Sequence, residues 1–214
     1  MITLLTCAAT ALFACQASSG TVGKPALNTS GGALLEEQAC FDVHHYLLDL
    51  EVMPEARAVK GELTMTARVL ERAPEIALHL DPALTIDGVV GGVDGAWKPL
   101  EFARPDGVIF IQSGMLLSEK GTDFRVQVRY SGKPRIAPNP PWDGGFTWKE
   151  AGGKPWFVTS CQGEGGDIWW PCKDHPSDKP ETMDLRFTVP AGLVVATNGA
   201  RVKTETSDGK TTSE

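Results

Sequence analysis

Histidine and cysteine are the first residues to consider for metal binding or catalysis in this 214-residue chain. The four histidines are His44, His45, His79 and His175, and no two of them have the i, i+4 spacing of a helical zinc-binding pair. His44 and His45 lie near Cys40, but three such residues without the rest of a ligand set are a weak metal signal. The sequence therefore predicts no metal site and no catalytic residue in this chain.

The five cysteines bear on the cellular compartment of the protein. Cys7 and Cys15 lie at the start of the chain, so removal of a leader would leave Cys40, Cys161 and Cys172. An odd number in an oxidising compartment leaves a free thiol or an intermolecular partner. Cys161 and Cys172 could form a disulfide, but sequence spacing alone does not establish one.

The first residues predict export. Residues 1–14 are mostly apolar and small, and this run is too short for a transmembrane helix, which is typical of a signal peptide, although no Lys or Arg precedes it. The run ends in Leu-Phe-Ala-Cys, which resembles the lipobox of bacterial lipoproteins, where the cysteine is lipidated. We expect residues 1–15 to be a signal peptide, Cys15 to carry the lipid, and the protein to be anchored to a membrane in the periplasm of a Gram-negative-type bacterium. The alternative is an ordinary cleaved signal with a chance cysteine.

Composition separates a linker from a folded domain. Residues 16–33 are largely Ser, Gly, Thr and Ala, which cannot bury enough surface to fold. We expect residues 16–38 to be a flexible linker and residues 39–214 to be one folded domain. The chain is 42% hydrophobic and 22% charged, which is sufficient for a buried core. Its net charge of −7 provides no basic surface for phosphates, so nucleic acid is not an expected partner.

The folded part has the period of β-strands. Between Val59 and Val69 apolar residues alternate with polar ones, and the same period of two occurs from Tyr46 to Val52 and from Phe124 to Tyr130. Shorter apolar runs occur at 76–80, 84–86, 108–111, 185–189 and 194–197, and no segment has a sustained helical period. The sequence therefore predicts an all-β fold, a mainly antiparallel sheet or sandwich.

Two segments lack a strand pattern. Residues 132–155 are rich in Pro, Gly and Trp, which predicts a long functional loop whose Trp side chains pack on another surface. Residues 204–214 are polar and have no closing strand in their pattern, so the β domain is expected to be incomplete at this end.

Residues 156–199 carry several motifs in a fixed order. They are Trp-Phe-Val-Thr-Ser-Cys-Gln at 156–162, Trp-Trp-Pro-Cys-Lys-Asp-His-Pro at 169–176, Phe-Thr-Val-Pro at 187–190 and Thr-Asn-Gly at 197–199. This segment resembles the N-terminal domain of the aminopeptidase N and leukotriene hydrolase family. The run Pro-Trp-Asp-Gly-Gly-Phe-Thr-Trp at 141–148 resembles the bacterial branch of that family. The resemblance implies a saddle-shaped, mainly antiparallel β domain.

The resemblance also implies that the zinc site and the substrate-amine contact belong to different domains. In this family a following domain holds a zinc ion through a His-Glu-x-x-His helix and a downstream Glu, and the sequence of this chain contains no such motif. Zinc is therefore expected in the full-length enzyme and not on this chain, which alone is not expected to be active. The N-terminal domain contributes a Gln or Glu that contacts the α-amino group of the peptide substrate. That position is Gln162 here, and Ser160, two residues earlier on the same strand face, is expected to line the same pocket.

Neighbouring polar residues have simpler interpretations. Glu164 lies between glycines and is expected to have a structural role rather than to be a second amine anchor. Asp174 is expected to bond to the backbone of its Pro-containing turn and to pair with Lys179. Trp169 and Trp170 are expected to pack in the core and against a neighbouring catalytic domain.

Three functions follow from these observations. The first is the substrate-amine-contacting domain of a zinc metallo-aminopeptidase that is complete only with further sequence. The second is a non-catalytic exported binding module whose Trp-rich surface takes a glycan or a protein, since five tryptophans occur between Trp142 and Trp170. The third is an inactive remnant of such an enzyme.

Overall fold

A computed structural model describes residues 30–114, 116, 117 and 119–214 of the chain. The expected signal peptide and the lipidation site Cys15 lie outside the described residues. No helix in the described part is both long enough and apolar enough to cross a membrane.

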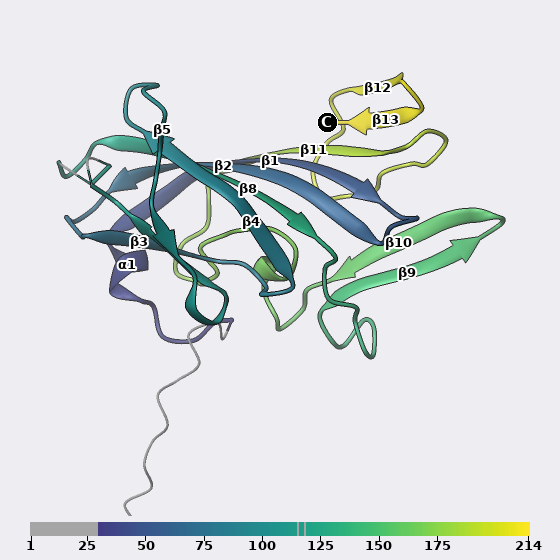
Figure 1. Ribbon diagram of the computed structural model, residues 1–214, viewed down its shortest axis with the longest axis horizontal. Helices are drawn as coiled ribbons and strands as arrows, with labels where there is room; N and C mark the ends of the chain where they lie inside the picture. Colours follow the sequence, from purple (N-terminus) through teal and green to yellow (C-terminus); the bar gives the residue numbers. More distant parts are fainter. Residues whose placement is uncertain (1–29, 115, 118) are drawn as a thin grey trace, which may run out of the picture.

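The described residues are organised around a curved eight-stranded sheet (Figure 1). Its strands lie in the order β12, β13, β11, β1, β2, β8, β4, β5. β1 and β11 run parallel, and the other neighbouring pairs within the described residues are antiparallel. The strands are β1 (Phe41–Met53), β2 (Ala58–Val69), β4 (Leu84–Gly92), β5 (Lys98–Pro99), β8 (Asp123–Gly132), β11 (Thr182–Pro190), β12 (Thr204–Ser207) and β13 (Lys210–Ser213). The prediction of an all-β, mainly antiparallel domain is confirmed.

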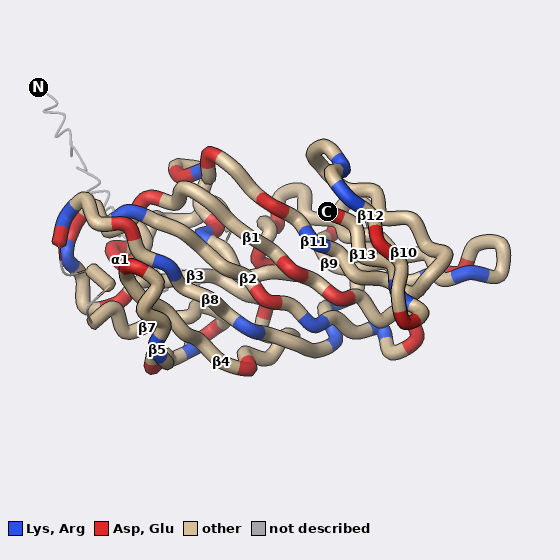
Figure 2. Tube along the Cα trace, turned by 90° about the horizontal axis from the view of Figure 1, so that it is seen from above, with Lys and Arg blue, Asp and Glu red and all other residues tan. Residues whose placement is uncertain are grey.

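Alternation in the sequence explains the central strands. Every second side chain of β2 from Val59 to Val69 is buried, and β8 repeats this pattern from Phe124 to Tyr130. The intervening polar residues lie on the outer face. Figure 2, which looks onto the sheet from above, shows acidic and basic residues distributed along β1 and β2. One face of the sheet is therefore exposed to solvent, and the other face forms the core.

A smaller sheet lies under the large one. It consists of β3 (Glu75–His79), β7 (Val108–Gln112) and β6 (Phe102–Ala103), and a short 3₁₀ helix, η1 (Pro105–Gly107), leads into β7. Ile76 and Leu78 of β3 are fully buried and belong to the same core as residues of β1, β2 and β8. The largest buried side chains of this core include Tyr130, Phe41, Phe124, Phe146, Leu48 and Met65.

The structure corrects three predictions about local elements. The expected loop at 132–155 contains β9 (Gly145–Ala151), which forms a projecting hairpin with β10 (Lys154–Ser160). The tail at 204–214, expected to lack a strand, forms the β12–β13 hairpin, and β13 pairs with β11. Residues 194–197, expected to be a strand, are not in one. In each case pairing with a neighbouring strand, rather than local hydrophobicity, decided the outcome.

The folded part begins a few residues before position 39. Residues Glu36–Ala39 form one helical turn, α1, and Gln38 within it is buried. Its Nε2 atom lies 3.1 Å from Nδ1 of the buried His79. The end of the predicted 16–38 linker is thus attached to the domain by a buried side-chain contact, for which the composition of the linker contains no signal.

Gly61 is required by the close approach of Tyr130. A Cβ atom at Gly61 would lie 2.3 Å from Cζ of the fully buried Tyr130 ring. Gly61→Ala is therefore expected to lower the free energy of unfolding by about 1 to 3 kcal/mol, because the ring must move within a packed core. Denaturant unfolding measures the change. The control is Gly88→Ala, where a Cβ meets only the end of the flexible Arg129 side chain at 3.1 Å. Equal losses in both variants would contradict the explanation.

Candidate functional site

The candidate site lies where β10 ends. Ser160 is the last residue of β10 and pairs with Gly145 of β9. Gln162 lies in the turn that follows β10. The prediction that Gln162 and Ser160 share one face of a strand is therefore wrong. Its side chain is exposed and has no hydrogen-bond partner within the described part of the chain, whereas Ser160 is half-buried. The amide of Gln162 is therefore available to a ligand.

Glycine geometry shapes this turn. The carbonyl oxygen of Cys161 accepts bonds from the backbone N–H groups of Glu164 at 3.0 Å and Gly165 at 3.1 Å. Gly165 has φ of 92°, and a Cβ there would lie 2.3 Å from a carboxylate oxygen of Asp174. Glycine at this position is therefore needed both for the backbone conformation and for the close approach of Asp174.

Glu164 attaches the turn to the segment before β9. Its carboxylate forms an ion pair with Arg135 and accepts a bond from the Gly144 N–H at 3.4 Å. Arg135 also lies 3.3 Å from a carboxylate oxygen of Asp81. The hydrogen bond from Arg135 lowers the pKa of Glu164, so this carboxylate is ionised and already partnered. These contacts fit the structural role expected for Glu164. Sequence reasoning missed Arg135, because a lone basic residue in a Pro-rich and Gly-rich segment has no pattern that marks it.

Asp167 is a buried carboxyl group just after the turn. It belongs to the 3₁₀ helix η2 (Gly166–Ile168), is 7% exposed, and its Oδ1 atom has no hydrogen-bond partner in the described structure. Burial, followed by the nearby charges of Asp174 and Asp81, raises the pKa of Asp167 to about 7. This group therefore changes its charge near neutral pH.

The segment after η2 is attached to the underside of the large sheet. The Trp169 ring stacks on Phe187 with a centroid distance of 6.2 Å, and Trp170 contacts Tyr46 edge-on at 5.0 Å. The backbone of Cys172 pairs with that of His79. The expected core packing of both tryptophans is thus observed.

An ion pair fixes the end of this segment. Lys173, with 4% of its side chain exposed, pairs with Asp178 and donates to the carbonyl oxygen of Phe41 at 2.6 Å. The Asp178 carboxylate accepts the backbone N–H of Val43 at 3.2 Å. The predicted ion pair between Asp174 and Lys179 is not formed among the described residues, and the ion pair of this turn lies between Lys173 and Asp178.

The described cysteines Cys40, Cys161 and Cys172 are free thiols. Burial raises the pKa of both Cys161 and Cys172, which disfavours the thiolate form that disulfide exchange requires. Cys161 and Cys172 are therefore not joined by a disulfide in this structure.

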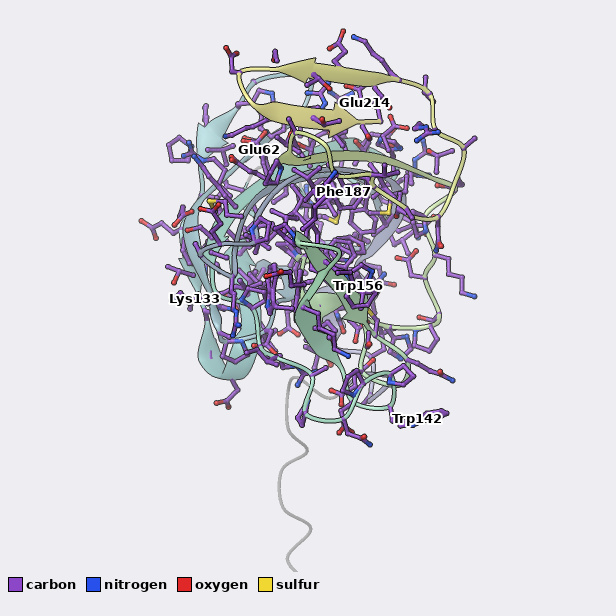
Figure 3. The ribbon with its side chains drawn as sticks, turned by 90° about the vertical axis from the view of Figure 1, so that its right-hand side faces the viewer. Glu62, Lys133, Trp142, Trp156, Phe187 and Glu214 are labelled. Atoms are coloured by element: carbon purple, nitrogen blue, oxygen red, sulfur yellow. The ribbon has the colours of Figure 1, made fainter. Side chains whose placement is uncertain are left out.

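An apolar groove lies along β10. It has a volume of about 490 Å³ and contains side chains of β10, β11 and the segment 192–197. Its lining includes Trp156, Val158 and Val194, which are 45%, 40% and 83% exposed. In Figure 3, Trp156 lies near the middle of the molecule, with Phe187 above it and Trp142 at the far lower end. We call this hollow the β10 groove.

The described residues do not fit the catalytic zinc ion of the family. His79 is buried and contacts Gln38, and His175 bonds to Ser177. Among the described residues, the group with suitable ligand atoms is Asp42, His44 and Glu181, which has one histidine and is not part of a His-Glu-x-x-His motif. No catalytic step is therefore assigned to zinc on this chain.

Solved structures share this fold. A two-domain M1 zinc metallopeptidase variant bound to L-arginine matches with a TM-score of 0.64 and 25% identity, over 82% of this chain and 39% of its own length. A Deinococcus radiodurans M1 zinc metallopeptidase variant bound to a Tyr-Ser-Ala substrate has a TM-score of 0.62 and 24% identity, over 81% of this chain and 38% of its own length. Yeast LTA4 hydrolase gives 0.58 and 21%, over 81% and 26%. The chain thus spans about two fifths or less of these relatives.

Of the two sequence comparisons, one agrees with this likeness. None of the curated proteins matches the chain. The family model described as the Peptidase M1 N-terminal domain matches residues 42–214, which is nearly the whole folded part. The chain therefore belongs to the M1 peptidase family, as its N-terminal domain.

Proposed function

We propose that this chain is the domain of a zinc-dependent aminopeptidase that contacts the free α-amino group of a peptide substrate. The supporting observation is the exposed Gln162 side chain, which has no partner within the described residues. A substrate ammonium group has three donors, and the carbonyl oxygen of this amide can accept one of them. Ser160, two residues earlier, is proposed to line the same pocket.

The β10 groove is proposed to receive the catalytic domain of the same enzyme. The groove and the amine contact are close in the chain, because residues 156–159 of β10 line the groove and Gln162 follows soon after the strand ends. The groove exposes Trp156 and Val158 to water, which is unfavourable for large apolar side chains without a covering surface. Zinc and the hydrolytic groups would belong to that second domain.

The tryptophans do not favour a glycan platform. Trp148, Trp169 and Trp170 are partly buried and pack against the core. Trp142 and Trp156 are the more exposed ones of this region, and Figure 3 shows them at separate places on the molecule. A flat surface of adjacent exposed rings, which a sugar-stacking site needs, is therefore not formed by these residues.

The proposed location is the periplasmic face of a membrane, with a lipid anchor on Cys15. Support comes from the sequence alone: the apolar leader ends in Leu-Phe-Ala-Cys, and residues 16–33 have the composition of a tether. Labelling of the native protein with a radioactive fatty acid tests the anchor, and Cys15→Ser should abolish the label.

The proposed function is tested first by the mass of the native protein in its cell envelope, detected with an antibody to residues 41–199. A product much larger than 22.9 kDa is expected, because catalytic sequence would follow the described domain. A product at or below that mass would remove the enzyme interpretation for this chain.

Gln162→Ala in the larger product is then expected to lower kcat/KM for peptide hydrolysis about 10-fold to 100-fold. A hydrogen bond to a charged group contributes about 1.5 to 3 kcal/mol, and each 1.4 kcal/mol corresponds to a factor of ten. The matched control is Gln127→Ala, which removes an amide bonded to Glu62 on the outer face of the sheet. Unchanged kinetics for Gln162→Ala, with an unchanged melting temperature, would contradict the amine-contact role.

A further inference from the structure

A group of polar residues lies at the start of β1, separate from the Gln162 turn. The pairing of β1 with β2 shifts register between Val43 and His45, so His44 lies in a bulge. Val43 is buried, whereas Asp42, His44 and His45 are half-buried. The backbone N–H of Glu181, directly before β11, donates to the carbonyl oxygen of His44 at 3.0 Å. The backbone of Asp42 is therefore held by its pairing with Arg68, and those of His44 and Glu181 are held together by this hydrogen bond.

The side chains of these three residues converge. Nδ1 of His44 lies 2.8 Å from Oε1 of Glu181. One potential ligand atom from each of Asp42, His44 and Glu181 lies within 4.8 Å of the others. The second ring nitrogen of His44, Nε2, is buried and has no hydrogen-bond partner in the described part of the chain.

The surrounding charges favour a cation. Arg68 of β2 pairs in register with Asp42, but its guanidinium is engaged with Asp123 of β8 at 2.7 and 3.1 Å. The carboxylates of Asp42, Asp123 and Glu181 thus outnumber the single guanidinium. On the β11 side, His45 bonds to Thr182 at 2.8 Å and lies 3.7 Å from the carboxylate of Asp184.

We propose that Asp42, His44 and Glu181 form a binding site for a divalent transition-metal ion such as zinc. One imidazole and two carboxylates suit zinc, cobalt or nickel better than calcium or magnesium, which prefer oxygen ligands alone. Zinc bonds to nitrogen and oxygen at about 2.0 to 2.2 Å, and water would complete the coordination. On binding, the proton shared by His44 and Glu181 moves to solvent or to the other ring nitrogen.

Such an ion would link β1 to the start of β11. These strands form the parallel pair of the large sheet, with His45 opposite Thr182. Cys40, which the sequence places near both histidines, does not take part: it is buried, and its thiol donates to the carbonyl oxygen of Glu37 at 3.4 Å. The site depends on Glu181, 137 residues away from His44 in the chain.

The test uses the purified full chain without an affinity tag. Isothermal titration with zinc chloride is expected to show one site that is lost or weakened at least tenfold in His44→Ala and in Glu181→Gln. At a zinc concentration ten times the dissociation constant, the melting temperature of the unsubstituted chain should rise by about 3 to 6 °C. His175→Ala is the matched control, because this histidine bonds locally to Ser177 and should leave zinc binding unchanged.

The outcomes separate the possibilities. Loss of binding in His44→Ala and Glu181→Gln, with retention in His175→Ala, supports the site. If either variant has an altered melting temperature without zinc, the titration of Asp42→Asn provides an independent test. Retention of zinc binding in His44→Ala, Glu181→Gln and Asp42→Asn, or no binding by the unsubstituted chain, would overturn the proposal. The result does not depend on the proposed peptidase function, because no substrate is used.

Discussion

Asp178→Ala is expected to lower the free energy of unfolding by about 3 to 5 kcal/mol. The substitution leaves the Lys173 ammonium group buried with 4% of its side chain exposed, and its remaining oxygen partner is the Phe41 carbonyl. It also removes the acceptor for the backbone N–H of Val43. Denaturant unfolding of the full chain, followed by tryptophan fluorescence, measures the loss.

Two further variants distinguish a lost ion pair from general damage. Lys173→Met combined with Asp178→Leu should recover part of the loss, because no unpaired charge then remains in the interior. Glu205→Ala is the control, since it breaks the exposed pair with Lys203 and should have little effect. A loss in Asp178→Ala no larger than in Glu205→Ala would show that the buried pair is not important for stability.

The second large effect is expected at Asp167 and depends on pH. The pKa of Asp167 is about 7 in the folded chain, against an ordinary value of 3.8. Between these values the folded chain holds a proton that the unfolded chain has lost. The contribution of Asp167 to the free energy of unfolding therefore falls as the pH rises from about 4 to about 7, by an amount on the order of 4 kcal/mol, and is constant above that range.

Asp167→Asn should remove this dependence, because the amide is neutral at every pH in the range. The variant is expected to be more stable than the unsubstituted chain at pH 8 and nearly equal to it at pH 4. Unfolding curves at both values provide the comparison. Asp87→Asn, at an exposed position of β4, should leave the pH profile unchanged. An Asp167→Asn profile that retains the full slope would assign the dependence to other groups.

The sequence alone determined the central strands of the large sheet and the family. Alternating apolar residues mark β2 and β8 in full, because on a half-buried strand the period of two is a local property of the chain. The ordered motifs at 156–199 predicted the M1 N-terminal domain that the family model matches. They also selected Gln162, whose exposed side chain the structure places in a turn and not on the strand.

Pairings between distant segments were decided only by the tertiary structure. The β9–β10 hairpin and the pairing of β13 with β11 lie in segments whose local pattern is that of a loop or a polar tail. The Glu164–Arg135 contact joins residues 29 positions apart, and the His44–Glu181 contact joins residues 137 positions apart. Burial, and with it the raised pKa of Asp167, depends on the surrounding charges and packing. A local pattern carries no information on these contacts, because they form only when the large sheet brings the segments together.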